Sequence, residues 1–121
     1  MARWTGWWEQ HVLGRRSMHN LVLDVAADGT VTGGGEDCVG PFTFQGQFRP
    51  DGTISLVKRY LGRHWVAYEG QNSGEGIYGI WDIPGFDTGR FALRPLGESE
   101  DACDEIQELV PAGASNRFTE K

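Results

Sequence analysis

The sequence predicts an all-β fold: a single eight-stranded antiparallel up-and-down barrel followed by a short C-terminal helix. Eight short segments between residues 3 and 95 alternate apolar and polar residues, as strands with one buried face do. Glycine, proline and Asp-Gly signals separate these segments at nearly even spacing. No connection is long enough for a crossover helix, so parallel βαβ units are excluded. A chain of 121 residues is expected to form one domain.

The expected strands are residues 3–9, 17–26, 30–37, 41–49, 53–60, 64–71, 76–83 and 88–95. The turns Ala27-Asp28-Gly29 and Pro50-Asp51-Gly52 have the form of three-residue hairpin loops with glycine in the left-handed position. Leu61-Gly62-Arg63 has a similar form, and Pro84-Gly85 marks a later turn. Residues 1–97 are therefore assigned to the barrel domain.

The C-terminal residues have a different pattern. Residues 98–111 predict an amphipathic helix, because Ser99 suits its N-cap and one apolar stripe runs along it. The stripe consists of Ala102, Cys103, Ile106, Leu109 and Val110. We expect this helix to pack on the barrel at the end where the last strand exits, and residues 112–121 to form a flexible tail.

The short loops also predict which residues face each other across neighbouring strands. The predicted pairs are Val25 with Val31, Phe48 with Ile54, and Tyr60 with His64. Propagating this register places one apolar face in the interior: Leu21, Leu23, Val25, Val31, Phe42, Phe44, Phe48, Ile54, Leu56, Val66, Tyr68, Ile77, Trp81, Ile83, Phe91 and Leu93. The glycines between them fit either a tight taper or a cavity.

Several inward positions at one end of the barrel are polar, although their neighbours are apolar. Alternate loops of a meander lie at alternate ends, so the loop 9–16 shares this end with the turns 37–41, 60–64 and 83–88. Ligand sites in barrels occur at such mouths. The candidate ligand-binding residues are Lys58, Tyr60, His64, His19, Asp37, Trp81 and Tyr68. The alternative is that these groups only satisfy one another, as buried polar groups must.

The charge of the chain limits its partners. The formal net charge is −6, so a general attraction to nucleic-acid phosphates is not expected. Seven of the 17 carboxylates lie at or after Glu98, so the barrel itself is close to neutral. Arg15, Arg16 and Arg63 fall in loops at the polar mouth, which favours an anionic small molecule there.

The cysteine and apolar content give expectations about compartment and cofactors. No stretch approaches the roughly 20 apolar residues of a membrane helix, and the N-terminus lacks a signal-peptide pattern, so a cytoplasmic protein without membrane contact is expected. Cys38 and Cys103 could pair, although nothing else indicates an oxidising compartment. The cysteines lack metal-binding spacing, and His19, His64 and Asp37 come from distant positions, so no metal or other cofactor is expected.

The first third of the chain contains an ordered set of short motifs: Trp4-Thr5-Gly6-Trp7-Trp8, Leu13-Gly14, Ser17-Met18 and Asp28-Gly29-Thr30-Val31-Thr32-Gly33. In this order the motifs resemble the start of the avidin and streptavidin family. This resemblance implies a calycin-type barrel that forms oligomers, with a ligand mouth at the end that carries the loop between strands three and four. Arg15 and Arg16 precede Ser17 where the family has ligand-binding groups, and the last strand lacks the family's ureido partner. Biotin is therefore not the expected ligand.

The favoured function is a non-catalytic binding barrel for a small ligand or a peptide end. In this hypothesis Lys58, Tyr60 and His64 bind a polar head group, and Trp81 belongs to an apolar wall. The sequence favours it because no nucleophile, base and orienting group stand out together.

Two alternatives remain open at the level of sequence. The first is an enzyme of the isomerase or lyase type, with His64 or His19 as acid or base. The second is a filled barrel that serves as an interaction domain. In that case the outward residues Trp65, Tyr78 and Ile80 would form a partner patch or the interface of a homodimer or higher oligomer.

Overall fold

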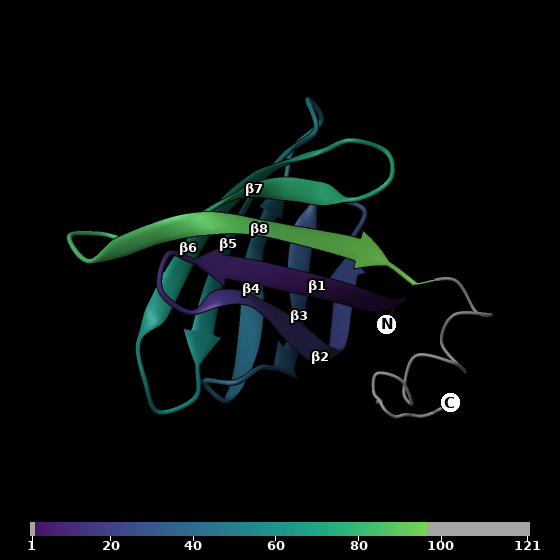
Figure 1. Ribbon diagram of the computed structural model, residues 1–121. Coiled ribbons are helices and arrows are strands. Elements are labelled where there is room, and N and C mark those ends of the chain that lie inside the picture. The colour runs from purple at the N-terminus through teal and green to yellow at the C-terminus, as the bar shows by residue number, and fades with distance from the viewer. Residues whose placement is uncertain (1, 97–121) are drawn as a thin grey trace, which may run out of the picture.

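The computed structural model describes residues 2–96, which form one closed antiparallel barrel (Figure 1). Eight strands follow one another around the barrel in sequence order, and β8 pairs with β1 to close it. The strands are β1 (Ala2–Gln10), β2 (Gly14–Val25), β3 (Thr30–Glu36), β4 (Pro41–Phe48), β5 (Thr53–Tyr60), β6 (Trp65–Asn72), β7 (Ile77–Ile83) and β8 (Asp87–Pro95). This architecture confirms the predicted barrel.

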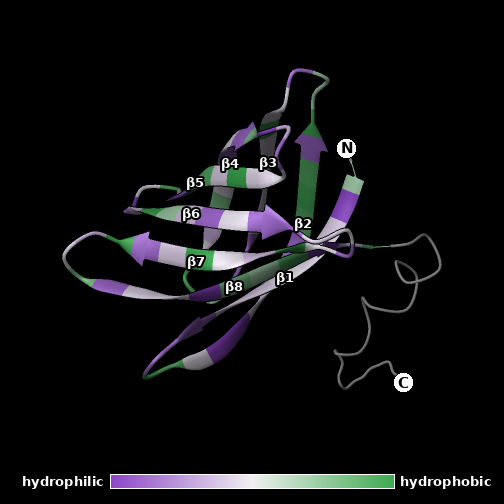
Figure 2. Cartoon of the chain, turned by 90° about the horizontal axis from the view of Figure 1, so that it is seen from above, coloured by the Kyte–Doolittle hydropathy of each residue, from purple (hydrophilic) through white to green (hydrophobic). Residues whose placement is uncertain are grey.

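The predicted register is present in the structure. Phe48 pairs with Ile54, and the backbone N–H of Tyr60 donates a hydrogen bond of 3.1 Å to the carbonyl of His64. Because side chains alternate between the two faces of a strand, this register sends one apolar set inward. Figure 2 shows the alternation as bands of hydrophobic and hydrophilic residues along the strands.

Aromatic rings fill the middle of the barrel. The ring centre of Tyr68 lies 5.2 Å from that of Phe44 and 4.5 Å from that of Phe91. Aromatic pairs at these distances stabilise a core beyond the area they bury. The buried apolar cluster consists of Trp8, Met18, Leu21, Leu23, Val31, Phe42, Phe44, Ile54, Leu56, Tyr60, Val66, Tyr68, Ile77, Trp81, Phe91 and Leu93.

Two inward glycines show why the interior is narrow. A methyl group on Gly46 would lie 1.9 Å from the carbonyl oxygen of Ser55, and one on Gly79 would lie 2.0 Å from the carbonyl oxygen of Glu69. Both positions therefore need a residue without a side chain, because the neighbouring strand occupies the space. Of the two sequence interpretations of these glycines, the structure supports close packing of strands at these two positions.

A bulge interrupts β2, the longest strand. The β1–β2 register shifts between Trp4 and Gly6, and the β2–β3 register shifts between His19 and Val22. Asn20 lies at this point with a φ of 54°, which few residues other than glycine adopt. The strand is strongly curved (Figure 1). Bulges bend a strand and re-aim its side chains.

Other predictions have different outcomes. Val25 pairs with Val31 as predicted, but it is 46% exposed and not part of the core. The predicted helix 98–111 and tail 112–121 lie outside the described residues, as does Cys103, whose pairing with Cys38 the sequence leaves open. Within residues 2–96 there is no helix long and apolar enough to span a membrane.

Candidate functional site

A buried ion pair lies at the predicted mouth. Lys58 faces inward because β5 alternates, and its neighbours on the same face, Leu56 and Tyr60, are buried as well. Its Nζ lies 2.6 Å from Oδ2 of Asp37, and the two side chains are 1% and 0% exposed. Asp37 follows β3 in a tight turn, where its backbone N–H and C=O both bond to Gly40. The turn thus places the Asp37 carboxylate inside this end of the barrel, next to Lys58.

The Asp37 carboxylate accepts hydrogen bonds from several elements of the fold. Its Oδ2 accepts hydrogen bonds from the hydroxyl of Tyr60 at 2.7 Å and from Nε1 of Trp8 at 3.1 Å, in addition to Lys58. Its Oδ1 accepts from the backbone N–H of Val39 at 2.9 Å. Because these four donors come from three parts of the fold, the carboxylate ties β1, β5 and the β3–β4 turn together.

Aromatic rings surround the ammonium of Lys58. Its Nζ lies 4.3 Å from the ring centre of Phe42, 4.8 Å from that of Tyr60, 5.5 Å from that of Tyr68 and 5.7 Å from that of Trp8. The Nζ also bonds to the hydroxyl of Tyr68 at 3.2 Å. Ring faces attract cations, so this cage partly replaces the water that the ammonium loses. We call these six residues, including Asp37, the Lys58 cluster.

Burial and charge set the protonation states in the Lys58 cluster. Burial lowers the pKa of Lys58 to about 8, although the hydrogen bond and charge of Asp37 oppose the shift. Burial acts to raise the pKa of Asp37, but the hydrogen bonds and charge of Lys58 and Tyr60 outweigh it and hold the pKa below its usual value. Burial raises the pKa of Tyr60 and of Tyr68; Asp37 raises it further, through its hydrogen bond and charge in Tyr60 and through its charge in Tyr68. At neutral pH the cluster therefore holds an ion pair and two neutral phenols.

The structure brings four of the seven candidate residues together and separates the other three. Asp37, Lys58, Tyr60 and Tyr68 form the core of the Lys58 cluster. His19 and His64 are both exposed, so neither belongs to this buried cluster. His19 lies beside the bulge, which disrupts the alternation, and His64 lies in the turn just before β6, with its ring centre 5.2 Å from that of Tyr60.

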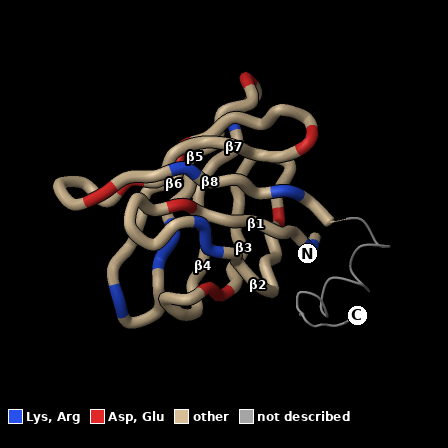
Figure 3. Tube along the Cα trace, viewed as in Figure 1, with Lys and Arg blue, Asp and Glu red and all other residues tan. Residues whose placement is uncertain are grey.

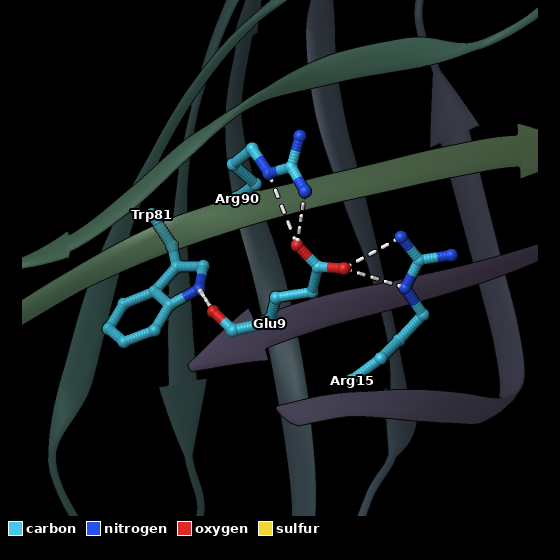
Figure 4. A network of polar contacts seen from close by, with 4 residues as sticks. All are labelled: Glu9, Arg15, Trp81 and Arg90. Carbon is cyan, nitrogen blue, oxygen red and sulfur yellow. Dashed lines mark hydrogen bonds and ion pairs between the residues drawn. The ribbon is translucent and has the colours of Figure 1, made fainter. Parts of the chain in front are cut away.

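Trp81 is buried as predicted, but its polar atom points elsewhere. Its Nε1 donates to the backbone carbonyl of Glu9 at 2.9 Å and so joins β7 to β1 (Figure 4). Sequence reasoning missed Trp8 and Phe42 as neighbours of the lysine. Phe42 was placed on the interior face, and Trp8 continues the inward alternation of Trp4 and Gly6, so a signal for both exists in the sequence.

A groove of about 880 Å³ lies beside the β2 bulge, which we call the β2 groove. It runs along β1 and β2 to the β3–β4 turn, and Asp37 is the one member of the Lys58 cluster among its lining residues. Its basic lining residues are Arg3, Arg15, Arg16 and His19. Basic positions on β2 are visible in Figure 3. The groove therefore combines an exposed basic wall with a link to the buried cluster.

The arginines of the β2 groove differ in their partners. Arg15 binds Glu9 through two nitrogens at 2.9 and 2.6 Å, and its guanidinium lies 3.7 Å from the ring centre of Trp7. The other oxygen of Glu9 binds Arg90 (Figure 4). Arg16 is exposed and makes no ion pair with any residue in 2–96. Arg16 is thus the cation of this groove that can bind an anion without first losing a carboxylate partner.

The groove lining holds two carboxylates, and only one of them has a cationic partner in the described part of the chain. Lys58 neutralises Asp37, as described above, whereas Glu36 keeps its charge and accepts a hydrogen bond of 2.9 Å from the side-chain amide of Asn20. Among residues 2–96 there is no group of three histidines, cysteines or carboxylates that could hold a metal ion. With Arg3, Arg15 and Arg16 against Glu36 and the paired Asp37, the lining carries more positive than negative charge, which favours an anion.

Comparison of the chain with protein-family models, with curated proteins and with solved structures finds no significant match.

Proposed function

We propose that this protein is a non-catalytic binding barrel that takes a small anionic molecule in the β2 groove. The observation that carries the proposal is the groove itself, because its volume of about 880 Å³ lies within the range of small-molecule sites and its wall presents Arg16 without an ion-pair partner in the described chain. The resemblance of residues 4–33 to avidin supports a ligand at the end with the β3–β4 turn.

The Lys58 cluster has a positioning role in this proposal. Lys58 and Tyr60 hold the Asp37 carboxylate, and Asp37 holds the turn that forms the inner wall of the groove. Tyr68 and Trp81 support the same end of the barrel from inside. His19 contributes to the groove wall, whereas His64 is not among its lining residues. The ligand contacts are thus assigned to Arg16 and His19, and the fixed turn to the cluster.

A titration monitored by NMR tests this proposal. Citrate and inorganic phosphate serve as probes, and the backbone amide signals of the full chain report where each anion binds. We expect the largest shifts in residues 15–20 and 37–38. Arg16→Ala should weaken binding about tenfold, because a charge-assisted hydrogen bond contributes roughly 1.5–3 kcal/mol. His19→Ala should weaken it by a smaller factor.

The matched controls are Arg63→Ala and His64→Ala. Both residues are exposed at the same end of the barrel, and neither lines the β2 groove. Binding should be retained in both. Equal losses in the groove variants and the control variants would show a general charge effect and overturn the proposal, as would shifts that are spread evenly over the surface.

A second candidate function rests on the outer face of the barrel. Trp65, Tyr78 and Ile80 are 47%, 45% and 49% exposed on the adjacent strands β6 and β7, and Val57 on β5 is 38% exposed. Neighbouring exposed apolar residues of this size are typical of interaction sites. Sedimentation velocity over a range of concentrations tests self-association, which the double variant Trp65→Ser/Ile80→Lys should abolish. A monomer at all concentrations would contradict a homo-oligomer.

A further inference from the structure

We propose that the acidic C-terminal segment, residues 98–110, binds back into the β2 groove and competes there with the anionic ligand. The competition rests on the proposed function, whereas the contact between segment and groove does not. The first observation is position: Leu96, the last described residue, lines the groove, and its backbone N–H donates to the carbonyl of Arg3 at 3.0 Å. The chain thus leaves the barrel at the edge of this groove.

The second observation is charge complementarity. The segment holds six carboxylates and no lysine or arginine: Glu98, Glu100, Asp101, Asp104, Glu105 and Glu108. The groove lining holds Arg3, Arg15 and Arg16 against two carboxylates, Glu36 and Asp37, of which Asp37 is neutralised by Lys58. The segment is therefore the part of the chain with the highest density of the charge that this groove attracts, and exposed opposite charges attract until salt screens them.

The third observation is reach. The first carboxylate of the segment lies two residues after Leu96, and an extended chain advances about 3.3–3.6 Å per residue. Thirteen residues span about 20 Å as the expected helix and about 40 Å when extended, so either form can reach along residues 15–21 of β2, which line the groove. A short tether also raises the effective concentration of the segment at the groove to the millimolar range. Weak contacts are then sufficient for a substantial bound fraction.

As a consequence, the C-terminal segment competes with the ligand for the β2 groove. A single exposed ion pair contributes little to binding, but several pairs on one tethered segment act together. A ligand binds only the fraction of molecules in which the segment has left the groove, so its apparent affinity falls by that fraction. The identity of the ligand does not matter for this effect, as long as it is anionic and uses Arg16.

A paramagnetic label on the segment tests the contact directly. In the full chain with Cys38→Ser, a nitroxide on Cys103 labels the segment alone. The signals of residues 15–20 and 37–40 should be broadened, and 0.5 M NaCl should reverse the effect. Reduction of the nitroxide by ascorbate provides the reference. Broadening confined to the turns 27–29, 50–52 and 73–75 at the other end, or no localised broadening, would overturn the proposal.

A second experiment separates the contact from the competition. The full chain with Glu100→Gln/Asp104→Asn/Glu108→Gln should bind citrate about three- to tenfold more tightly than the wild type. The matched control, Asp24→Asn/Glu75→Gln/Asp82→Asn, removes the same charge from the barrel surface and should change binding less than twofold. Equal gains in both variants would overturn the competition. Broadening at the groove without citrate binding in any variant would contradict the proposed function and leave the contact standing.

Discussion

The Lys58 cluster and the β2 groove lie on two sides of the same turn, and they use similar side chains in opposite ways. Lys58 is buried, and its ammonium has a carboxylate, a phenol and several rings around it. Arg16 is exposed and makes no ion pair within residues 2–96. Because desolvation is costly, the buried cation requires partners, whereas the exposed cation keeps its water and can exchange it for a ligand.

Asp37 connects the two regions. Its carboxylate accepts four hydrogen bonds, from Trp8, Lys58, Tyr60 and the backbone of Val39. A side chain with so many partners has little freedom, and the turn that carries it forms part of the groove wall. The comparison therefore teaches that polarity at a barrel mouth does not by itself mark a ligand site. The relevant property is whether the polar groups have partners within the protein.

The strongest test of this comparison is removal of the buried cation. Lys58→Met leaves the Asp37 carboxylate buried without its counter-ion, and breaking a buried pair in this way costs about 3–5 kcal/mol. Urea denaturation should show this loss in the free energy of unfolding. A loss below about 1 kcal/mol would mean that the ion pair is not what holds the turn.

The double variant Lys58→Met/Asp37→Asn is the control for this change. It removes both charges together, and the asparagine oxygen can still accept a hydrogen bond from Tyr60 or Trp8. We expect it to recover more than half of the lost free energy, since replacing both charges of a buried pair is often close to neutral. A double variant as unstable as Lys58→Met would assign the loss to packing and not to charge.

The pH dependence of stability gives the next largest effect. The pKa of Lys58 is about 8 in the folded protein and 10.5 in an unperturbed lysine. Between these values the unfolded chain binds more protons than the folded one, so the free energy of unfolding rises with pH. From pH 7 to 9.5 it should rise by about 2 kcal/mol relative to the double variant. Parallel pH profiles of the two proteins would refute the lowered pKa.

The sequence predicts the fold and the interior well, for identifiable reasons. Three-residue loops with a left-handed glycine define a register, and a period of two then assigns every residue of a regular strand to one face. Lys58, Tyr60 and Tyr68 lie on such strands and were placed correctly. Trp8 was not assigned to the site, because the connection that begins after Gln10 is not a short hairpin loop of known register.

The two histidines show where this reasoning ends. His19 lies beside a bulge, where an extra residue shifts the alternation, and the sequence signals this only through Asn20, a residue that tolerates a positive φ. His64 has the predicted pairing with Tyr60, but it lies at the rim of the barrel. A side chain at the rim stays exposed even on a position that the alternation assigns to the interior face. The β2 groove lies beside the same bulge. The alternation of apolar and polar residues does not reveal the bulge, so it does not predict the groove either.

The bulge itself gives the third prediction. Asn20→Val places a β-branched residue at a φ of 54° and should lower the free energy of unfolding by about 1–2 kcal/mol. Asn20→Gly tolerates this backbone and loses only the hydrogen bond to Glu36, so we expect less than about 1 kcal/mol. Urea denaturation of both variants checks the order. A valine that costs no more than glycine would mean that the positive φ at the bulge is not a constraint.

The smallest effect is expected on the open side of the turn. Arg16→Gln removes an exposed cation that makes no ion pair in the described chain, so the free energy of unfolding should change by no more than about 0.5 kcal/mol. This is the counterpart of Lys58→Met: Lys58 is the counter-ion of a buried carboxylate, and Arg16 is available to a ligand. The same urea denaturation measures both. A loss above about 1 kcal/mol in Arg16→Gln would show that Arg16 is also a structural residue, and the contrast between the two regions would then fail.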